Sequence, residues 1–312
     1  MEKEKDTHLY KFLSTDPRSI SSRTGTGIHK SSVKEIREKV LYNHHRYMKL
    51  FWKTLLKSQY FRKSIITHIR ADYFNEIDLS IKIKNGYWAQ ILNHDALDSF
   101  SEIFIENEYL EFLPETEIKK IIDIGANYGY FTIWLQSMSP NIELESLMIE
   151  PCINCHDSID GLMKDQKSKG ISHILDGVIA DPKLEHSSFL DRPFMASSSF
   201  VTPEEQEEVR KVRIITEDEI ISKLSPPYDL IKCDIEGSEW EFLSHYPKIL
   251  SGTKHLILEW HSWHNGGGSK DQIIESLKQM HFSIVNSSVP SPATGRKGQV
   301  GLILAENESI AN

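Results

Sequence analysis

Cysteine is scarce in this chain of 312 residues. Its three cysteines, Cys152, Cys155 and Cys233, are too few for the disulfide framework of a small secreted protein. Cys152 and Cys155 have a C-x-x-C spacing, but no second ligand pair stands at the spacing of a structural zinc site. The cysteine content therefore fits a reducing compartment, and we expect the protein to be cytoplasmic.

Long apolar runs are also missing, and we expect no secretory leader. The longest apolar runs fall far short of the roughly 20 residues that a membrane-spanning helix needs. The first six residues are charged and do not lead into the apolar core of a signal peptide. The chain has no overall excess of positive charge either, because its net charge is −9. From this acidic balance we predict that nucleic acid is not a partner.

The positive charge that is present lies near the start of the chain. Residues 30–70 contain eleven Lys or Arg against two Glu, and residues 31–85 contain no Gly or Pro. Ser32 and Glu35 form a capping-box pattern, after which apolar residues recur at helical spacing. We predict a flexible polar tail over residues 1–30 and a basic helical extension over residues 31–76. This helix either packs on the main domain or makes peripheral contact with an anionic membrane or acceptor.

Strands alternate with helices from residue 77 onwards. The pattern predicts a hairpin over residues 77–92 around Lys84-Asn85-Gly86, a helix over residues 98–112, and then seven core strands. These strands are expected at 120–124, 146–149, 172–180, 229–234, 255–260, 281–286 and 299–305. Helices are expected near 128–138, 155–167, 217–224, 237–250 and 270–280. Residues 77–312 are thus predicted to form an α/β, Rossmann-like domain with a mostly parallel seven-stranded sheet and a C-terminal antiparallel hairpin.

The most informative stretch is residues 121–131, Ile-Ile-Asp-Ile-Gly-Ala-Asn-Tyr-Gly-Tyr-Phe. It predicts a strand, a turn with two glycines four residues apart, and a helix, as in the first unit of a nucleotide-binding sheet. A dinucleotide fingerprint would place glycine where Asn127 stands. The acid before the turn suits a cationic ligand, and S-adenosylmethionine (SAM) is such a ligand because it carries an ammonium and a sulfonium group. The candidate cofactor contacts here are Asp123, Gly125, Asn127, Gly129 and Phe131.

Two further strand ends complete the predicted cofactor pocket, because ligands of open α/β sheets lie outside the carboxyl ends of the strands. Glu150 ends the second strand, 21 residues beyond Gly129, where an acid accepts hydrogen bonds from ribose hydroxyls. Val178 and Ile179, in the third strand, are candidates to border an adenine ring.

The fourth and fifth strands end in titratable residues. Asp234 and Glu236 follow the fourth strand, and alternation places Glu259 and His261 on the same side of the fifth. Buried carboxylates are costly unless they are paired, protonated or metal-bound, so we interpret these four residues as catalytic candidates. Asp234 is also a candidate cofactor contact. Asp234, Glu259 and His261 are candidate ligands of a divalent metal, which the spacing alone does not establish.

Taken in this order, the motifs resemble those of the FkbM family of SAM-dependent methyltransferases. The resemblance covers roughly residues 77–305. It rests on residues 123–131, Glu150-Pro151, the serines near 198, residues 229–239 and Glu259-Trp260-His261. Membership would imply a class I methyltransferase fold with SAM as methyl donor. It would also imply O-methylation, often of sugar hydroxyls or of polyketide and other natural-product hydroxyls.

The leading hypothesis is therefore an O-methyltransferase that acts on a saccharide or a secondary metabolite. An alcohol is a poor nucleophile while protonated, so a base or a metal must assist. We expect His261 or Asp234 to act as the base, with Glu236 and Glu259 orienting the substrate or the base. Two alternatives stay open, an N-methyltransferase for a small amine or a protein side chain, and a non-catalytic SAM-binding module.

Overall fold

The computed structural model describes residues 79–91, 94–153, 155–156, 159–161, 170–184, 186–190, 199–200, 209–262, 269–292 and 298–310. The predicted tail over residues 1–30 and the predicted basic helix over residues 31–76 lie outside these ranges, as do the serine at position 198 and its neighbour 197. Among the helices that the structure describes, none is both long enough and apolar enough to cross a bilayer.

The described part begins with the predicted hairpin. Strand β1 (Leu79–Lys82) pairs antiparallel with β2 (Trp88–Ile91), and the turn η3 (Lys84–Gly86) joins them. Asn85 and Gly86 both have positive φ angles, 56° and 85°, as a tight hairpin turn requires. Ala89 and Ile91 of β2 are buried in one cluster with Tyr130, whose hydroxyl donates a hydrogen bond of 2.6 Å to the Gln90 carbonyl. The hairpin is thus held against the helix that follows the glycine turn.

The helix predicted over residues 98–112 is in fact three short elements. Helix α4 (His94–Phe100) continues as a π-helical segment, η4 (Ser101–Glu106), which ends at Asn107. Asn107 has a left-handed conformation, with a φ angle of 54°, that asparagine tolerates better than most residues and that stops a helix. A 3-10 turn, η5 (Leu110–Phe112), follows. The break directs Tyr109 into the protein, where it is buried.

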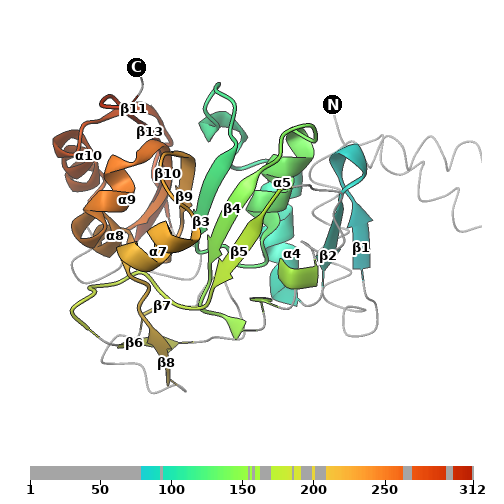
Figure 1. Ribbon diagram of the computed structural model, residues 1–312, viewed down its shortest axis with the longest axis horizontal. Coiled ribbons are helices and arrows are strands. Elements are labelled where there is room, and N and C mark those ends of the chain that lie inside the picture. Colours follow the sequence, from blue (N-terminus) through green and yellow to red (C-terminus); the bar gives the residue numbers. More distant parts are fainter. Residues whose placement is uncertain are drawn as a thin grey trace, which may run out of the picture. The chain divides into compact units, whose positions relative to one another are not determined.

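The central sheet confirms the predicted fold class. Its seven main strands are β3 (Lys120–Ile124), β4 (Glu145–Ile149), β5 (Ser172–Leu175), β9 (Tyr228–Cys233), β10 (Thr253–His261), β11 (Phe282–Ser287) and β13 (Gln299–Asn307). They lie in the order β11-β13-β10-β9-β3-β4-β5, and the short β12 (Ser291–Pro292) pairs with β13 (Figure 1). Within this sheet, the first five strands in chain order pair in parallel; they are β3, β4, β5, β9 and β10. Strand β13 runs antiparallel to both β10 and β11. This is a Rossmann-like α/β fold with an antiparallel hairpin at one edge of a mostly parallel sheet.

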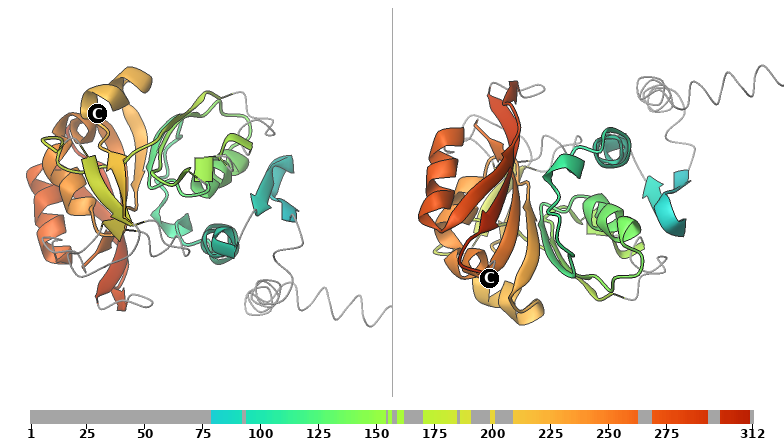
Figure 2. Two further views of the ribbon diagram at one scale, coloured as in Figure 1. Left: turned by 90° about the horizontal axis from the view of Figure 1, so that it is seen from below. Right: turned by 90° about the horizontal axis from the view of Figure 1, so that it is seen from above.

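Helices cover both faces of the sheet (Figure 2). One face packs on α8 (Glu239–His245), α9 (Pro247–Ser251) and α10 (Lys270–Gln279), with α7 (Glu217–Lys223) beside them. The opposite face packs on α5 (Tyr130–Met138). Because side chains alternate along β3, Ile122 and Ile124 join the α8 side while Ile121 joins the α5 side. The same alternation turns Asp123 toward α5, where Thr132 meets it.

Two features of the third strand region differ from the prediction. Strand β5 ends at Leu175 instead of continuing to residue 180, because Asp176-Gly177 interrupts the pairing, and Val178 then forms an isolated bridge with Ile214. The chain next forms a separate antiparallel sheet, β7-β6-β8, from β6 (His186–Leu190), β7 (Ser199–Phe200) and β8 (Val209–Arg213). Its strands are short and rich in polar residues, so the apolar pattern did not reveal them.

Candidate active site

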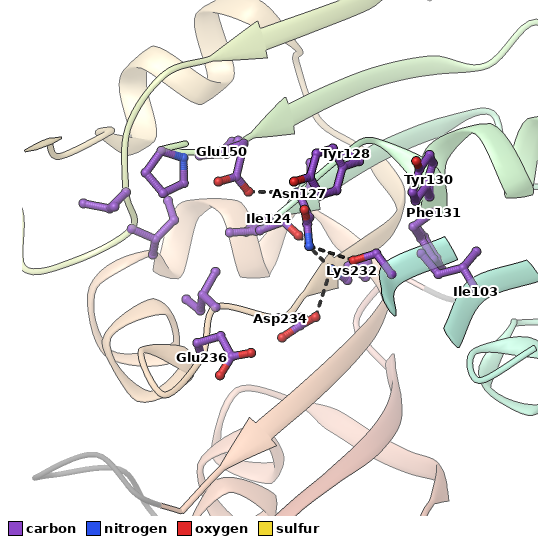
Figure 3. Close-up of a pocket in the computed structure, with 18 of the residues that line it drawn as sticks. Ile103, Ile124, Asn127, Tyr128, Tyr130, Phe131, Glu150, Lys232, Asp234 and Glu236 are labelled. Carbon is purple, nitrogen blue, oxygen red and sulfur yellow. Dashed lines mark hydrogen bonds and ion pairs between the residues drawn. The ribbon is translucent and has the colours of Figure 1, made fainter. Parts of the chain in front are cut away.

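A cavity opens at the carboxyl ends of the parallel strands, where the sequence predicted the cofactor. It has a volume of about 920 Å³, including space open to solvent. In Figure 3, Glu150 lies on one side of this cavity and Asp234 and Glu236 lie on the other. Most of the predicted cofactor contacts line it, namely Gly125, Asn127, Phe131, Glu150, Val178, Ile179 and Asp234.

The glycine turn forms one wall of the cavity by packing closely on a neighbouring loop. Gly125 has a φ angle of 72°, and a Cβ atom built on it would lie 1.8 Å from the carbonyl oxygen of Asp234. Only glycine fits such an approach in this conformation. The backbone N–H of Asn127 points to Glu150, and the Asn127 side chain donates a hydrogen bond of 2.8 Å to the Ser99 hydroxyl. The turn therefore connects three parts of the chain at the Glu150 side of the cavity.

Glu150 is almost fully buried at the end of β4. Its Oε2 accepts the N–H of Asn127 and its Oε1 accepts the N–H of Cys152, both at 2.8 Å. Burial raises the pKa of Glu150 to about 7, although these two N–H groups and His156 act against the rise. Each carboxylate oxygen keeps a further lone pair, so the two protein hydrogen bonds leave capacity for ribose hydroxyls. The ribose contact stays a prediction.

Asp123 lies beneath the turn and is not part of the cavity lining. The Thr132 hydroxyl donates to its Oδ2 at 2.9 Å, and the Lys232 ammonium lies 3.7 Å from its Oδ1. Burial raises the pKa of Asp123, while Lys232 opposes that rise. Gly129, whose φ angle is 75°, starts α5 and is likewise absent from the lining. Asp123 and Gly129 thus lie outside the cavity lining. Their direct contact with the cofactor stays a prediction.

Lys232 contacts both the glycine turn and Asp234 on the other side of the cavity. Its ammonium donates a hydrogen bond of 2.9 Å to the Gly125 carbonyl and lies 3.4 Å from Asp234 Oδ2. Burial alone would lower the pKa of Lys232, but the carboxylates of Asp234 and Asp123 outweigh it and raise the pKa above its usual value. Lys232 is thus a buried cation placed between two acids.

Tyr109 is a site residue that the sequence did not suggest. Its hydroxyl donates a hydrogen bond of 2.9 Å to Glu259 Oε2 and lies 3.4 Å from Asp234 Oδ2. Tyr109 also lines the cavity, and the Lys232 ammonium stands 5.9 Å from the centre of its ring. It is 125 and 150 residues from its two acidic partners. No local pattern predicts so distant a contact, which depends on the helix break at Asn107.

Three of the four predicted catalytic residues meet at the ends of β9 and β10. The ring of His261 is 3% exposed, its Nε2 lies 4.0 Å from Asp234 Oδ1, and the same nitrogen lies 3.9 Å from Glu259 Oε1. Its Nδ1 lies 2.9 Å from Glu239 Oε1. The fourth predicted residue, Glu236, lines the cavity and has a left-handed backbone, with a φ angle of 54°.

The charged groups of this cluster shift one another's pKa values. Burial would lower the pKa of His261, but the carboxylates of Glu239 and Glu259 outweigh it and raise the pKa to about 10. Burial and the neighbouring Asp234 raise the pKa of Glu259 well above its usual range. Glu239, in the first turn of α8, was not among the predicted site residues.

Comparison with known proteins adds only distant likenesses. Neither a family model nor a curated protein matches the chain. Among solved structures, the putative tRNA (m1A22) methyltransferase Sp1610 of Streptococcus pneumoniae has 13% identity and a TM-score of 0.39, covering 65% of this chain and 69% of its own. TrmK of M. capricolum, in complex with S-adenosyl-homocysteine, has 12% identity and a TM-score of 0.38, covering 65% and 67%. The putative RNA methyltransferase PH1948 of Pyrococcus horikoshii has 13% identity and a TM-score of 0.36, covering 70% and 85%.

These likenesses correct one prediction. The net charge of −9 led us to exclude nucleic acid as a partner, and that exclusion is contradicted by the similar structures, which include one named as a putative tRNA methyltransferase and one named as a putative RNA methyltransferase. Net charge is a sum over the whole chain and does not report where basic groups gather. Here eleven basic residues stand within residues 30–70, and acids elsewhere hide them in the sum.

Proposed function

We propose that this protein is a SAM-dependent O-methyltransferase that methylates a hydroxyl group of a saccharide or a secondary metabolite. The observation that carries the proposal is one continuous cavity. It is lined by the glycine turn and Glu150, where we place the donor, and by Asp234, where we place the acceptor. A methyl group can pass between two molecules only if both reach the same space, so this arrangement suits transfer better than simple binding.

The charge of the cavity supports a cationic donor. Among the described residues, the acidic and basic side chains of its lining are four acids, Glu102, Glu150, Asp234 and Glu236, and one base, Lys232. Burial raises the pKa of Glu102 to about 8 and that of Glu150 to about 7, so these two acids carry only part of their negative charge at neutral pH. A cleft lined by one sign of charge concentrates ligands of the other sign. SAM brings an ammonium and a sulfonium group, and the apolar side chains of Val178 and Ile179 suit its adenine ring.

The chemistry asked of the protein is alignment and proton removal. The acceptor oxygen forms a bond to the methyl carbon while the carbon–sulfur bond breaks, and its electron pair stays on sulfur in S-adenosylhomocysteine. The hydroxyl proton must leave to a base. Asp234 is our choice, because it lines the cavity whereas His261 and Glu259 are not among the residues that line it. Lys232 and Tyr109 hold its Oδ2 in place.

The choice of a hydroxyl acceptor rests on the resemblance to the FkbM family and on the composition of the acceptor end. Tyr109, Asp234 and Glu236 line this part of the cavity and offer hydrogen-bonding groups to a polyhydroxylated ligand. An amine acceptor would need less help from a base, so the two acceptor classes differ in how strongly the rate depends on Asp234.

The test is turnover with SAM and a pool of acceptors that includes glycosides, nucleotide sugars, phenolic natural products and small amines. S-adenosylhomocysteine formation is followed by mass spectrometry, and SAM affinity by calorimetry. Asp234→Asn should bind SAM yet lose turnover by about 10²-fold or more. Asp218→Asn, on the exposed first turn of α7, is the matched control and should behave as wild type.

Three results would change the proposal. Wild-type turnover by Asp234→Asn would remove Asp234 as the base. Methylation of amines alone would support the N-methyltransferase hypothesis, and tight SAM binding without consumption by any acceptor would support a non-catalytic SAM-binding module. A protein that does not bind SAM would overturn the proposal as a whole.

A further inference from the structure

We propose that Asp234, Glu259 and His261 bind a divalent transition-metal ion at the carboxyl ends of β9 and β10. One ligand atom of each residue lies within 4.8 Å of the other two. His261 Nε2 is 4.0 Å from Asp234 Oδ1 and 3.9 Å from Glu259 Oε1. These separations exceed a hydrogen bond. Two donors that each stand about 2.1 Å from one ion lie about 3.0–3.4 Å apart at octahedral or tetrahedral angles, so the three side chains must move closer together to bind it.

Both carboxylates are held so that one oxygen faces the common point. The Lys232 ammonium and the Tyr109 hydroxyl lie on Asp234 Oδ2, which leaves Oδ1 on the side of His261. Tyr109 also donates to Glu259 Oε2, and Oε1 is the oxygen near His261. The neighbours therefore orient the two carboxylates before any ligand binds.

The imidazole is oriented in the same way. Glu239 Oε1 lies 2.9 Å from His261 Nδ1 and also accepts the backbone N–H groups of Ile235, at 3.2 Å, and Gly237, at 3.1 Å. Both side chains are almost completely buried. A carboxylate on one ring nitrogen, with the other nitrogen turned to acidic groups, is the usual surrounding of a metal-binding histidine. This arrangement distinguishes the cluster from a mere group of acids.

The donor set selects a class of metal. Mg²⁺ and Ca²⁺ prefer oxygen ligands alone, whereas one imidazole nitrogen with carboxylate oxygens suits Mn²⁺, Co²⁺, Fe²⁺ or Zn²⁺. This inference deepens the proposed function and rests on it for its role. An ion at this place would stand beside Asp234, and it would favour loss of the proton from an acceptor hydroxyl that it contacts.

Binding can be measured without SAM or an acceptor. The full chain is treated with a chelator and titrated with Mn²⁺ by electron paramagnetic resonance, and with Zn²⁺ by calorimetry. We expect saturable binding of one ion per chain, against which Mg²⁺ competes poorly. His261→Gln and Glu259→Gln should abolish it. Glu239→Gln and Tyr109→Phe, which keep all three ligands, should weaken it by about 10- to 100-fold.

His255→Gln is the matched control. His255 is a second buried histidine of β10, near the opposite end of that strand and 3.8 Å from an acid, Glu306. It should bind metal as the wild type does, and circular dichroism should show that every variant is folded. Absence of saturable binding would overturn the inference, as would wild-type affinity in a folded His261→Gln. Methyl transfer that persists in metal-free protein would leave the proposed function intact, and metal binding without SAM binding would do the reverse.

Discussion

Lys232 is the residue on which the charges of the site depend most. It is buried, and its ammonium contacts the Gly125 carbonyl, Asp123 and Asp234 at 2.9, 3.7 and 3.4 Å. A buried ion pair is costly to break from one side, because the remaining charge has neither water nor partner. Asp123 is more sensitive to this effect than Asp234, because it is completely buried and, among the described residues, Thr132 is the other side chain that hydrogen-bonds to it.

We therefore expect Lys232→Met to lower the free energy of unfolding by about 3–5 kcal/mol. The measurement is urea denaturation followed by circular dichroism. Asp123→Asn, added to Lys232→Met, should recover part of the loss, because it removes the uncompensated charge. A loss below about 1 kcal/mol in the single variant would show that Lys232 does not compensate Asp123.

At the scale of elements, the turn between β3 and α5 is fixed by its approach to the loop after β9. Gly125 and Gly86 have similar positive φ angles, 72° and 85°. A Cβ atom on Gly86 would meet nothing within 4 Å, whereas one on Gly125 would meet the Asp234 carbonyl oxygen. Alanine substitutions at these two glycines therefore distinguish the cost of left-handed backbone strain from the cost of close packing.

Gly86→Ala should cost only the left-handed strain of about 1–2 kcal/mol and leave SAM binding unchanged. Gly125→Ala carries the same strain and must also push β3 and the loop after β9 apart, so it should cost clearly more and abolish SAM binding. Denaturant unfolding and SAM calorimetry on both variants give the comparison. Equal costs in the two variants would mean that the close approach contributes nothing.

The elements also show how far the sequence could be interpreted. Buried parallel strands are near-continuous apolar runs, so β3, β4, β9 and β10 could be predicted within one or two residues. The same argument placed Asp234, Glu259 and His261 at one edge. Tyr109 and Glu239 could not be predicted, because their roles depend on where a helix breaks and on which face of α8 meets β10. Packing, and not local pattern, decides both.

At the scale of the whole molecule, a bound donor adds to stability by mass action. At a SAM concentration about 100 times its dissociation constant, the folded state gains about 2.7 kcal/mol. For a unit of this size that corresponds to a rise in melting temperature of about 5–10 °C, measurable by differential scanning calorimetry. Adenine alone should give a smaller shift, since it lacks the ribose that Glu150 is proposed to hold.

This shift should depend on pH, because burial raises the pKa of Glu150 to about 7. The ionised carboxylate accepts ribose hydroxyls better than the protonated one, so the shift should be larger at pH 8 than at pH 6. The free protein changes in the opposite sense. Folding raises the pKa of this carboxyl from 4.5 to about 7, so the free protein becomes less stable as the pH rises from 4.5 to about 7. Glu150→Gln should remove the pH dependence of the SAM shift, and an unchanged dependence would point to another group.

The position of β13 has a consequence for biosynthesis. It is the last of the described strands along the chain, yet it lies between β10 and β11. While the ribosome makes the preceding residues, β10 lacks its neighbour on that side and β11 has no partner in the main sheet. Unpaired strand edges recruit strands from other molecules. A released chain truncated between Ser287 and Gln299 should therefore be the form most prone to aggregate and most dependent on chaperones.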